Sequence, residues 1–226
     1  IMFSEKKKKI MVVNIGGGSN YSFLIGKKKF FSSDIGPGNT LIDKYCNLNF
    51  RKFFDDKGKL AQKGQVKNEI VEKWLKKKFL KKTPPCSFDN HFFKIEDFID
   101  KKIDKYDMLR SITFFSAKII SDLRHKINNE VDLWIFSGGG VQNLTLIKDI
   151  KDLLYDQNVF TCDELGIDSR FIESSAFAYI AIRTLKRIPS AFPETTGCVK
   201  KNICGKIFII IYPIFCSRNN KDKFFS

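Results

Sequence analysis

The segment VDLWIFSGGGVQN, residues 131–143, joins an apolar run to three consecutive glycines and then to a helix-like stretch. Val131–Phe136 has the composition of a buried strand. Gly138–Gly140 follow at once, and residues without a Cβ let a backbone come close to a ligand. A helix expected over residues 143–155 would point its free N–H groups at the same place, which favours an anion or a polar group there. The segment therefore predicts a strand–loop–helix unit of an α/β fold that carries a ligand-binding loop.

The order of the other expected elements extends this unit into a mixed sheet. Three short β-rich runs with tight turns between them, Ile10–Ile15, Tyr21–Ile25 and Phe30–Ser33, predict a meander. A meander followed by βαβα predicts an α/β domain with helices on both faces of its sheet, and Ile207–Tyr212 is a candidate edge strand. The predicted helices span residues 39–49, 66–80, 93–103, 106–127, 143–155 and 173–186, and the last two predicted strands are Leu133–Phe136 and Val159–Thr161.

Two further glycine-rich stretches lie upstream, each beside a predicted strand. In Asn14–Asn20, the turn at Gly16 and Gly17 can cup a phosphate with its backbone N–H groups, and a plain glycine hairpin is the alternative. In Asp34–Asn39, the turn Gly36-Pro37-Gly38 opens a helix. Three such loops on one short chain indicate a nucleotide site rather than ordinary turns.

Asp34 is the leading candidate for a catalytic residue. It is expected to end a strand beside the glycine turn, where a carboxylate can take a proton or orient a metal-bound water. The alternative is an aspartate that stabilises the turn through backbone hydrogen bonds. Glu173 opens the last predicted helix, where it serves either a site or the helix dipole. Asp43, one turn past Asn39, is interpreted as solvated or as part of a helix cap.

Charge and cysteine content narrow the class of protein. The net charge is +15, and it comes from 33 Lys and only 7 Arg spread along the chain, whereas Arg is the usual reader of bases and phosphates. We therefore expect a solvated lysine surface and regard nucleic acid as an unlikely partner. Six cysteines without a Cys-x-x-Cys pair, and two histidines, disfavour a zinc site or a disulfide framework and favour reduced thiols in the cytoplasm. The apolar run Ile207–Cys216 is too short to cross a bilayer as a helix.

The same loops belong to a longer series of motifs in a fixed order. The series contains Asn14-Ile15-Gly16-Gly17, Asn20, Asp34-Ile35-Gly36-Pro37-Gly38-Asn39, Leu41, Asp43, Asp56, Gly58, Ala61, Gly64, Pro84-Pro85, Ser111, Thr113, Ala117, Ser137–Asn143, Asp163, Gly166, Glu173, Ala176-Phe177-Ala178 and Thr196-Gly197. In this order and spacing it resembles the second half of the anhydro-N-acetylmuramic acid kinases, over about residues 8–206.

The resemblance implies a ribonuclease H-like lobe of the actin-like ATPase superfamily, which includes sugar kinases, actin and Hsp70, and in which two α/β lobes close around ATP. The implied reaction uses ATP and Mg²⁺ to open the 1,6-anhydro ring of anhydro-N-acetylmuramic acid, giving N-acetylmuramate 6-phosphate during peptidoglycan recycling in the cytoplasm. Asp34 corresponds to the general base. The resemblance assigns Gly16, Gly17, Gly138, Gly139, Gly140 and Asn143 to ATP, assigns Asn20, Gly36, Gly38, Asn39 and Glu173 to the sugar, and assigns no protein ligand to the metal.

Two departures from the family pattern affect what we expect of the chain's domain boundaries and of its activity on its own. The family's first lobe, with its Gly-Thr-Ser-x-Asp-Gly loop, is absent from this sequence, and Cys86–Asn90 stands where the family has a Lys-Ser start and a later Arg. We expect residues 8–206 to form the C-terminal kinase lobe, with 50–105 as a candidate helical insertion and 207–226 as a divergent tail. The chain, which begins at Ile1 rather than Met, is expected to derive from a longer one and to bind ATP poorly and catalyse little alone.

The missing lobe would then act in cis or in trans, and a homodimer is left open. Two alternatives remain. One is a degenerate, inactive lobe of the same kinase. The other is a protein of this fold whose lysines bind nucleic acid or a membrane surface.

Overall fold

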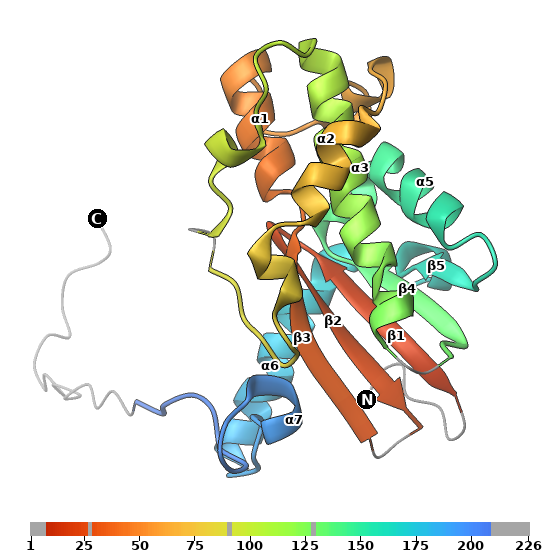
Figure 1. Ribbon diagram of the computed structural model, residues 1–226. Helices are drawn as coiled ribbons and strands as arrows, with labels where there is room; N and C mark the ends of the chain where they lie inside the picture. Colours follow the sequence, from red (N-terminus) through yellow and green to blue (C-terminus); the bar gives the residue numbers. More distant parts are fainter. Residues whose placement is uncertain (1–7, 27–28, 90–91, 128–129, 209–226) are drawn as a thin grey trace, which may run out of the picture.

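The computed structural model describes residues 8–26, 29–89, 92–127 and 130–208 (Figure 1). The strand order of its one five-stranded sheet is β3-β2-β1-β4-β5, antiparallel from β3 to β1 and parallel from β1 to β5. This arrangement confirms the predicted mixed sheet, a meander followed by βαβα. The strands are β1 (Lys9–Ile15), β2 (Gly18–Ile25), β3 (Lys29–Pro37), β4 (Leu133–Ser137) and β5 (Val159–Thr161).

Strand β3 continues past the predicted strand Phe30–Ser33, so Asp34 lies inside the strand. The expectation that Asp34 ends a strand is therefore wrong. The reason is a register shift between Ser19 and Asn20 on β2, which lets pairing continue as far as Pro37. Asn20 is the direct partner of Asp34 in this register, and directly opposed residues share one face of a sheet.

One face of the sheet is covered by helices α1 (Thr40–Phe50), α3 (Lys105–Ser121) and α5 (Leu144–Leu153). The central helix α3 begins at Asp104, whose carboxylate accepts hydrogen bonds from the N–H groups of Tyr106 and Asp107. The predicted helix 106–127 is interrupted, because the backbone at Asp122 opens to a ψ of −11° before the short helix α4 (Leu123–Lys126). The buried face of α3 packs on the apolar side chains of β1, β2 and β4, and this packing forms the main core.

Residues 51–104 wrap the outer side of α3 in short pieces. The predicted helix 66–80 is split into α2 (Asn68–Leu75) and the 3-10 turn η3 (Lys78–Lys81), and the predicted helix 93–103 is reduced to the 3-10 turn η5 (Ile95–Phe98). Two more 3-10 turns, η1 (Asp56–Gly58) and η2 (Ala61–Lys63), lie between α1 and α2. The ring of Trp74 in α2 packs against the rings of Phe98 and Phe115, at centroid distances of 5.6 and 5.7 Å, and those two rings also contact each other. The segment therefore contributes to the main core.

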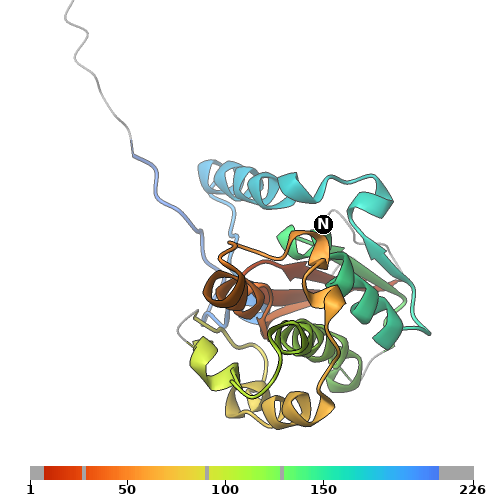
Figure 2. The same cartoon turned by 90° about the horizontal axis from the view of Figure 1, so that it is seen from above.

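Helix α6 (Ile172–Leu185) lies on the opposite face of the sheet, as Figure 2 shows, so helices are present on both faces as predicted. A second, smaller cluster of Ile10, Ile135 and Cys162 lies on this face, and Ile172 packs against it. The short helix α7 (Pro193–Thr196) lies beside β3, where the rings of Phe30 and Phe192 meet edge to face at 5.5 Å. The candidate edge strand 207–212 is irregular at residues 207–208, and its remainder lies outside the described residues.

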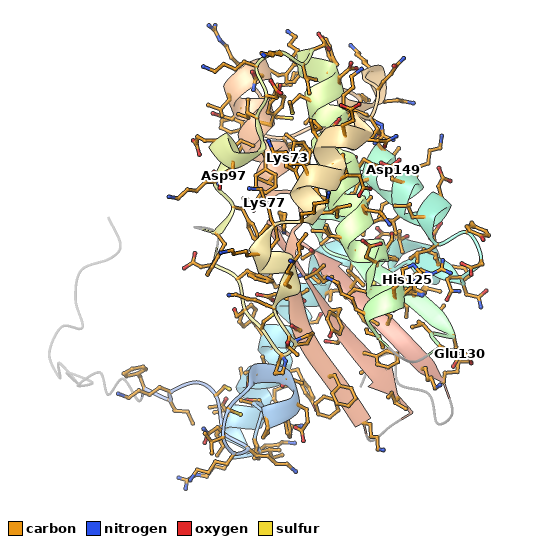
Figure 3. The ribbon with its side chains drawn as sticks, in the orientation of Figure 1. Lys73, Lys77, Asp97, His125, Glu130 and Asp149 are labelled. Atoms are coloured by element: carbon orange, nitrogen blue, oxygen red, sulfur yellow. The ribbon has the colours of Figure 1, made fainter. Side chains whose placement is uncertain are left out.

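Part of the lysine excess covers aromatic surface. The ammonium of Lys77, labelled in Figure 3, lies 4.8 Å from the ring centroid of Phe98, and that of Lys82 lies 4.4 Å from the ring of Phe92. Such contacts use the long apolar stem and the charge of one lysine together. None of the helices formed by the described residues is long and apolar enough to span a membrane.

Candidate functional site

Two of the glycine loops are joined by backbone hydrogen bonds. The carbonyl of Gly17 accepts from the N–H groups of Gly38 and Thr40, and the carbonyl of Gly16 accepts from the N–H of Asn39, all at 2.9 Å. A Cβ on Gly38 would lie 2.5 Å from the oxygen of Gly16, so only glycine fits at this crossing. Three N–H groups at the beginning of α1 are therefore already hydrogen-bonded to the hairpin turn. Two of them belong to Gly38 and Asn39, which the family resemblance assigns to the sugar.

The third glycine loop reaches the same place from β4. Gly138 has a φ of +85°, and a Cβ there would lie 2.4 Å from Oδ1 of Asn14. A Cβ on Gly140 would lie 2.3 Å from Cγ2 of Ile15, whereas a Cβ on Gly139 would meet nothing within 4 Å. All three predicted loops therefore meet at the ends of β1 and β4, and Gly139 presents an uncrowded stretch of backbone there.

Asn143, assigned to ATP by sequence, is 6% exposed and caps helix α5. Its Oδ1 accepts from the N–H of Leu146 at 3.0 Å, so that helix N-terminus is already partly satisfied. The loop at Gly58 packs on the cap, and the carbonyl of Gly58 accepts from Oγ1 of Thr145 at 2.8 Å. The structure thus gives the Asn143 side chain the task of holding the loop and helix together.

Asp34 is held by the segment that follows the two prolines. Its Oδ2 accepts from the backbone N–H of Phe88 at 2.8 Å, and its own N–H donates to the carbonyl of Cys86 at 3.0 Å. Oγ of Ser33 is within hydrogen-bonding distance of Sγ of Cys86, at 3.3 Å, and accepts from the Cys86 N–H at 2.9 Å. One carboxylate oxygen of Asp34 is thereby fixed by a backbone donor, which orients the other.

Asp34 and Asn20 line two cavities in common. One, of about 440 Å³, is rich in hydroxyl groups, and the other, of about 320 Å³, reaches toward the glycine crossing. Burial and the nearby Cys86 raise the pKa of Tyr21, so this phenol stays protonated as a hydrogen-bond donor. The first cavity is lined by Tyr21, Ser32, Ser33, Pro85, Cys86, Ser87, Thr195 and Thr196 besides the shared pair, and the second by Gly18, Ser19, Gly36, Phe88, Asp89 and Phe93.

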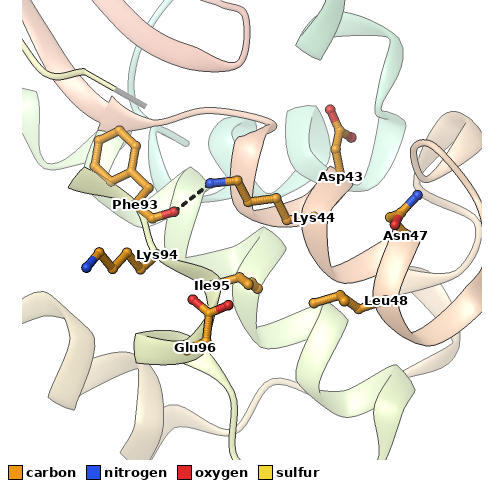
Figure 4. Close-up of a pocket in the computed structure, with 8 residues that line it drawn as sticks. All are labelled: Asp43, Lys44, Asn47, Leu48, Phe93, Lys94, Ile95 and Glu96. Atoms are coloured by element: carbon orange, nitrogen blue, oxygen red, sulfur yellow. Dashed lines mark hydrogen bonds between the residues drawn. The ribbon is translucent and has the colours of Figure 1, made fainter. Parts of the chain in front are cut away.

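A third cavity, of about 560 Å³, adjoins the second at Phe93 (Figure 4). It lies between α1 and residues 93–96, and its walls carry Asp43 and Lys44 from α1. Burial raises the pKa of Asp43 to about 6, and Nζ of Lys44 donates to the carbonyl of Phe93 at 2.8 Å. The three cavities form a series along the segment 85–96, with Asp34 between the first two.

The remaining sugar candidates are placed differently from one another. Gly36 lies in β3 and lines the second cavity, and Asn39 precedes α1 without making a side-chain cap. Glu173 is exposed in the first turn of α6 and lines none of the three cavities around Asp34. The structure therefore brings Asn20, Asp34, Gly36 and Gly38 together, and leaves Glu173 apart from them.

Sequence reasoning missed the hydroxyl groups and Cys86 in the first cavity. Thr195 and Thr196 reach it from α7, about 160 residues after Asp34 in the chain. The motif Thr196-Gly197 was a signal, but nothing local indicated that it lies beside β3. Among the described residues, no group of three or more His, Cys, Asp and Glu side chains could hold a metal ion.

The sequence is similar to known proteins over most of its length. A model of the family described as anhydro-N-acetylmuramic acid kinase matches residues 1–210. The chain is 34% identical over 220 residues to an anhydro-N-acetylmuramic acid kinase of Clostridioides difficile, covering 92% of this chain and 57% of that protein. It is 30% identical over 214 residues to one of Coxiella burnetii, with the same shares.

The chain therefore spans a little over half the length of the curated relatives it matches. Among solved structures, a ligand-bound xylulose kinase from Lactobacillus acidophilus has a TM-score of 0.45 and 10% identity, over 67% of this chain and 34% of that one. The match of the family model to most of the sequence, together with relatives at 30–34% identity, shows that the chain belongs to the anhydro-N-acetylmuramic acid kinase family.

Proposed function

We propose that this chain is the C-terminal lobe of an ATP-dependent kinase that acts on 1,6-anhydro-N-acetylmuramic acid. The observation that carries the proposal is the placement of Asp34: its carboxylate is held by the Phe88 N–H between two cavities, next to the crossing of three glycine loops. Family membership supports this reaction class, and the carboxylate of Asp34 beside a hydroxyl-lined cavity of sugar size supports a general-base role. The lobe itself is proposed to span residues 8–206, with 50–105 as an insertion that completes its core.

In the proposed reaction, Asp34 takes a proton from a water molecule whose oxygen attacks C1 of the sugar. The bond between C1 and O6 breaks, O6 attacks the γ-phosphorus of ATP, and ADP leaves. The products are N-acetylmuramate 6-phosphate and ADP, and Asp34 releases the proton to solvent. A positioned general base contributes on the order of 10² to 10⁴ in rate.

ATP is proposed to lie along the glycine crossing. Gly16 and Gly17 would face the phosphates, and the open backbone at Gly139 would face the adenosine. Because the described residues offer no carboxylate cluster for a metal, Mg²⁺ would arrive with the nucleotide and take its ligands mainly from phosphate oxygens and water. When bound, it would neutralise charge on the transferring phosphoryl group.

The sugar is proposed to occupy the cavities on either side of Asp34. Asn20, Gly36 and the hydroxyl groups of the first cavity are placed to bind its polar groups, and Gly38 and Asn39 hold the turn that shapes the second cavity. Glu173 stays a predicted sugar contact, since it is exposed here and a second lobe could bring ligand to it. Phosphoryl transfer depends on charge and positioning from both walls of a cleft. The other wall is proposed to come from a first lobe, in cis or in trans, in the cytoplasm where ATP is present.

The test is an assay of ATP-dependent phosphorylation of 1,6-anhydro-N-acetylmuramic acid, with the first lobe of a family member supplied as a separate chain. We expect turnover only when both chains are present. A complete lack of turnover with a first lobe that binds this chain would contradict the kinase proposal and favour a degenerate lobe.

A further inference from the structure

The third cavity, between α1 and residues 93–96, has no role in the scheme above. It is the largest of the three, at about 560 Å³, and it shares one lining residue, Phe93, with the cavity beside Asp34. Phe93 is thus a wall common to both cavities, and a ligand whose ring lies at Asp34 has this space beside it, beyond Phe93. The chemistry of the walls indicates what kind of substituent this space would take. The walls are Asp43, Lys44, Asn47, Leu48, Phe93, Lys94, Ile95 and Glu96.

Lys44 is the distinctive wall residue. Its ammonium is fixed at 2.8 Å from the carbonyl oxygen of Phe93, at the junction with the second cavity, and the residue is half-buried. Within the described part of the chain, no carboxylate lies within 4.0 Å of this ammonium. An ammonium carries three N–H donors, and the Phe93 carbonyl takes one of them. A half-buried cation with donors to spare and no counter-ion favours binding of an anion.

The two acidic wall residues do not neutralise Lys44. Figure 4 shows the Lys44 side chain directed toward Phe93, with its ammonium turned away from Asp43. Burial alone raises the pKa of Asp43, with no cation compensating it, which agrees with that separation. Glu96 lies on the opposite wall beside the exposed Lys94. The charge of Lys44 therefore lies beside Phe93, the residue that also lines the cavity next to Asp34.

We propose that Lys44 binds the carboxylate of a sugar acid whose ring lies at Asp34, namely the lactyl carboxylate on O3 of the muramic acid skeleton. This inference rests on the proposed function for the position of the ring. Lys44 is then a specificity-determining residue, which distinguishes a muramic acid from a glucosamine that lacks the lactyl group. Lys94, exposed at the rim, adds a weaker attraction.

The test compares two ligands that differ only in the lactyl group, 1,6-anhydro-N-acetylmuramic acid and 1,6-anhydro-N-acetylglucosamine. Binding of each to the full chain is measured by titration calorimetry or by NMR shifts. We expect the wild-type chain to bind the muramic acid about tenfold more tightly, since a charge-assisted hydrogen bond contributes about that factor. Lys44→Gln should reduce the ratio to about one, and Lys44→Arg should restore part of it. Lys76→Gln, an exposed lysine after α2, is the matched control and should leave the ratio unchanged.

The inference is overturned if Lys44→Gln keeps the wild-type preference, or if the folded wild-type chain binds the two sugars equally or binds neither. A thermal melt of each variant confirms that it is folded. The phosphorylation assay with a supplied first lobe then separates the two proposals. Turnover with a preference independent of Lys44 removes this inference alone, whereas a Lys44-dependent preference without turnover removes the kinase function and keeps the carboxylate site.

Discussion

The carboxylate of Asp34 accepts a hydrogen bond from the backbone N–H of Phe88 at 2.8 Å, although 54 residues separate the two in the chain. The same segment is anchored a second time through the Asp34 N–H and the Cys86 carbonyl. A backbone donor cannot rotate away as a side chain can, so the orientation of Asp34 is fixed by main-chain geometry. This bond also ties the strand with the candidate base to the segment that borders all three cavities.

Replacement of that base is the first prediction. Asp34→Asn keeps an acceptor for the Phe88 N–H but cannot take a proton, so turnover with a supplied first lobe should fall by about 10² to 10⁴. ATP affinity should stay within about twofold, because the glycine crossing is untouched. The measurement is steady-state phosphorylation beside a nucleotide titration, with Asp152→Asn, an exposed change on α5, as the control. Undiminished turnover would rule out the general-base role.

Two glycine variants distinguish a glycine that is needed for folding from a glycine that is proposed to lie against ATP. In Gly38→Ala, the new Cβ would lie 2.5 Å from the Gly16 oxygen, so we expect a loss of about 1–3 kcal/mol in the free energy of unfolding. In Gly139→Ala, the Cβ meets nothing within 4 Å, so stability should change by less than about 0.5 kcal/mol while ATP affinity falls. Urea unfolding and a nucleotide titration measure both effects. Equal ATP affinity for Gly139→Ala and wild type would place the adenosine elsewhere.

The ion pair between Arg110 and Asp149 joins α3 to α5, and its two side chains are only 17% and 6% exposed. The contact is bidentate, with N···O distances of 2.5 and 2.6 Å, and Asp149 is labelled in Figure 3. Arg110→Ala leaves a buried carboxylate without its cation and should lower the free energy of unfolding by about 3 kcal/mol. Lys151→Ala breaks a surface pair with Glu164 and should cost less than about 1 kcal/mol.

If Arg110→Ala and Lys151→Ala lowered the free energy of unfolding equally, the buried Arg110 pair would contribute no more to stability than the surface pair. A double variant, Arg110→Met with Asp149→Leu, removes both charges together. It should recover most of the loss, since no unpaired charge remains buried.

Asp43 predicts a pH effect on stability. Burial raises its pKa from 3.8 to about 6, so folding favours the protonated form. The stability that this group contributes is complete below pH 3.8 and is lost as the pH rises through about 6. Asp43→Asn lacks this loss, so its gain over wild type should grow between pH 4 and pH 8 by on the order of 1 kcal/mol, reduced by solvent screening of a half-exposed group.

Urea unfolding of both proteins at a series of pH values gives this difference. Measuring the variant against wild type cancels the other titrating groups. Asp107, Asp156 and Glu164, whose pKa values are lowered by their lysine or arginine partners, would alone make the protein less stable in acid. A difference that shrank with rising pH would show that Asp43 is stabilised in its charged form.

The sequence pattern predicted the sheet well because the first four strands are short β-rich runs beside glycine turns, and β5 is a β-rich run of its own. It predicted too much helix in residues 66–103, where apolar spacing alone did not reveal that Phe93 and Phe98 are held by tertiary packing in irregular backbone and a 3-10 turn. The extension of β3 past Ser33 depends on a register shift in its neighbour, which local sequence does not encode.

The candidate site was predictable only in part for a similar reason. The glycine loops could be recognised from sequence, because few other residues allow two backbone segments to cross so closely. The Phe88 N–H and the hydroxyl groups of Thr195 and Thr196 reach Asp34's surroundings through long-range contacts. Asn143 could have been recognised as a helix cap from its residue type and position.

Three N–H groups at the beginning of α1 donate hydrogen bonds to the carbonyls of the hairpin turn, and these bonds tie the turn to the helix. A nucleotide that displaces the turn at Gly16 and Gly17 must carry α1 with it. Because Lys44 lies on the second turn of that helix, such a displacement would also move the ammonium relative to Phe93. In the proposed scheme, the nucleotide at the glycine turn and the sugar acid at Lys44 would therefore both contact elements tied to α1.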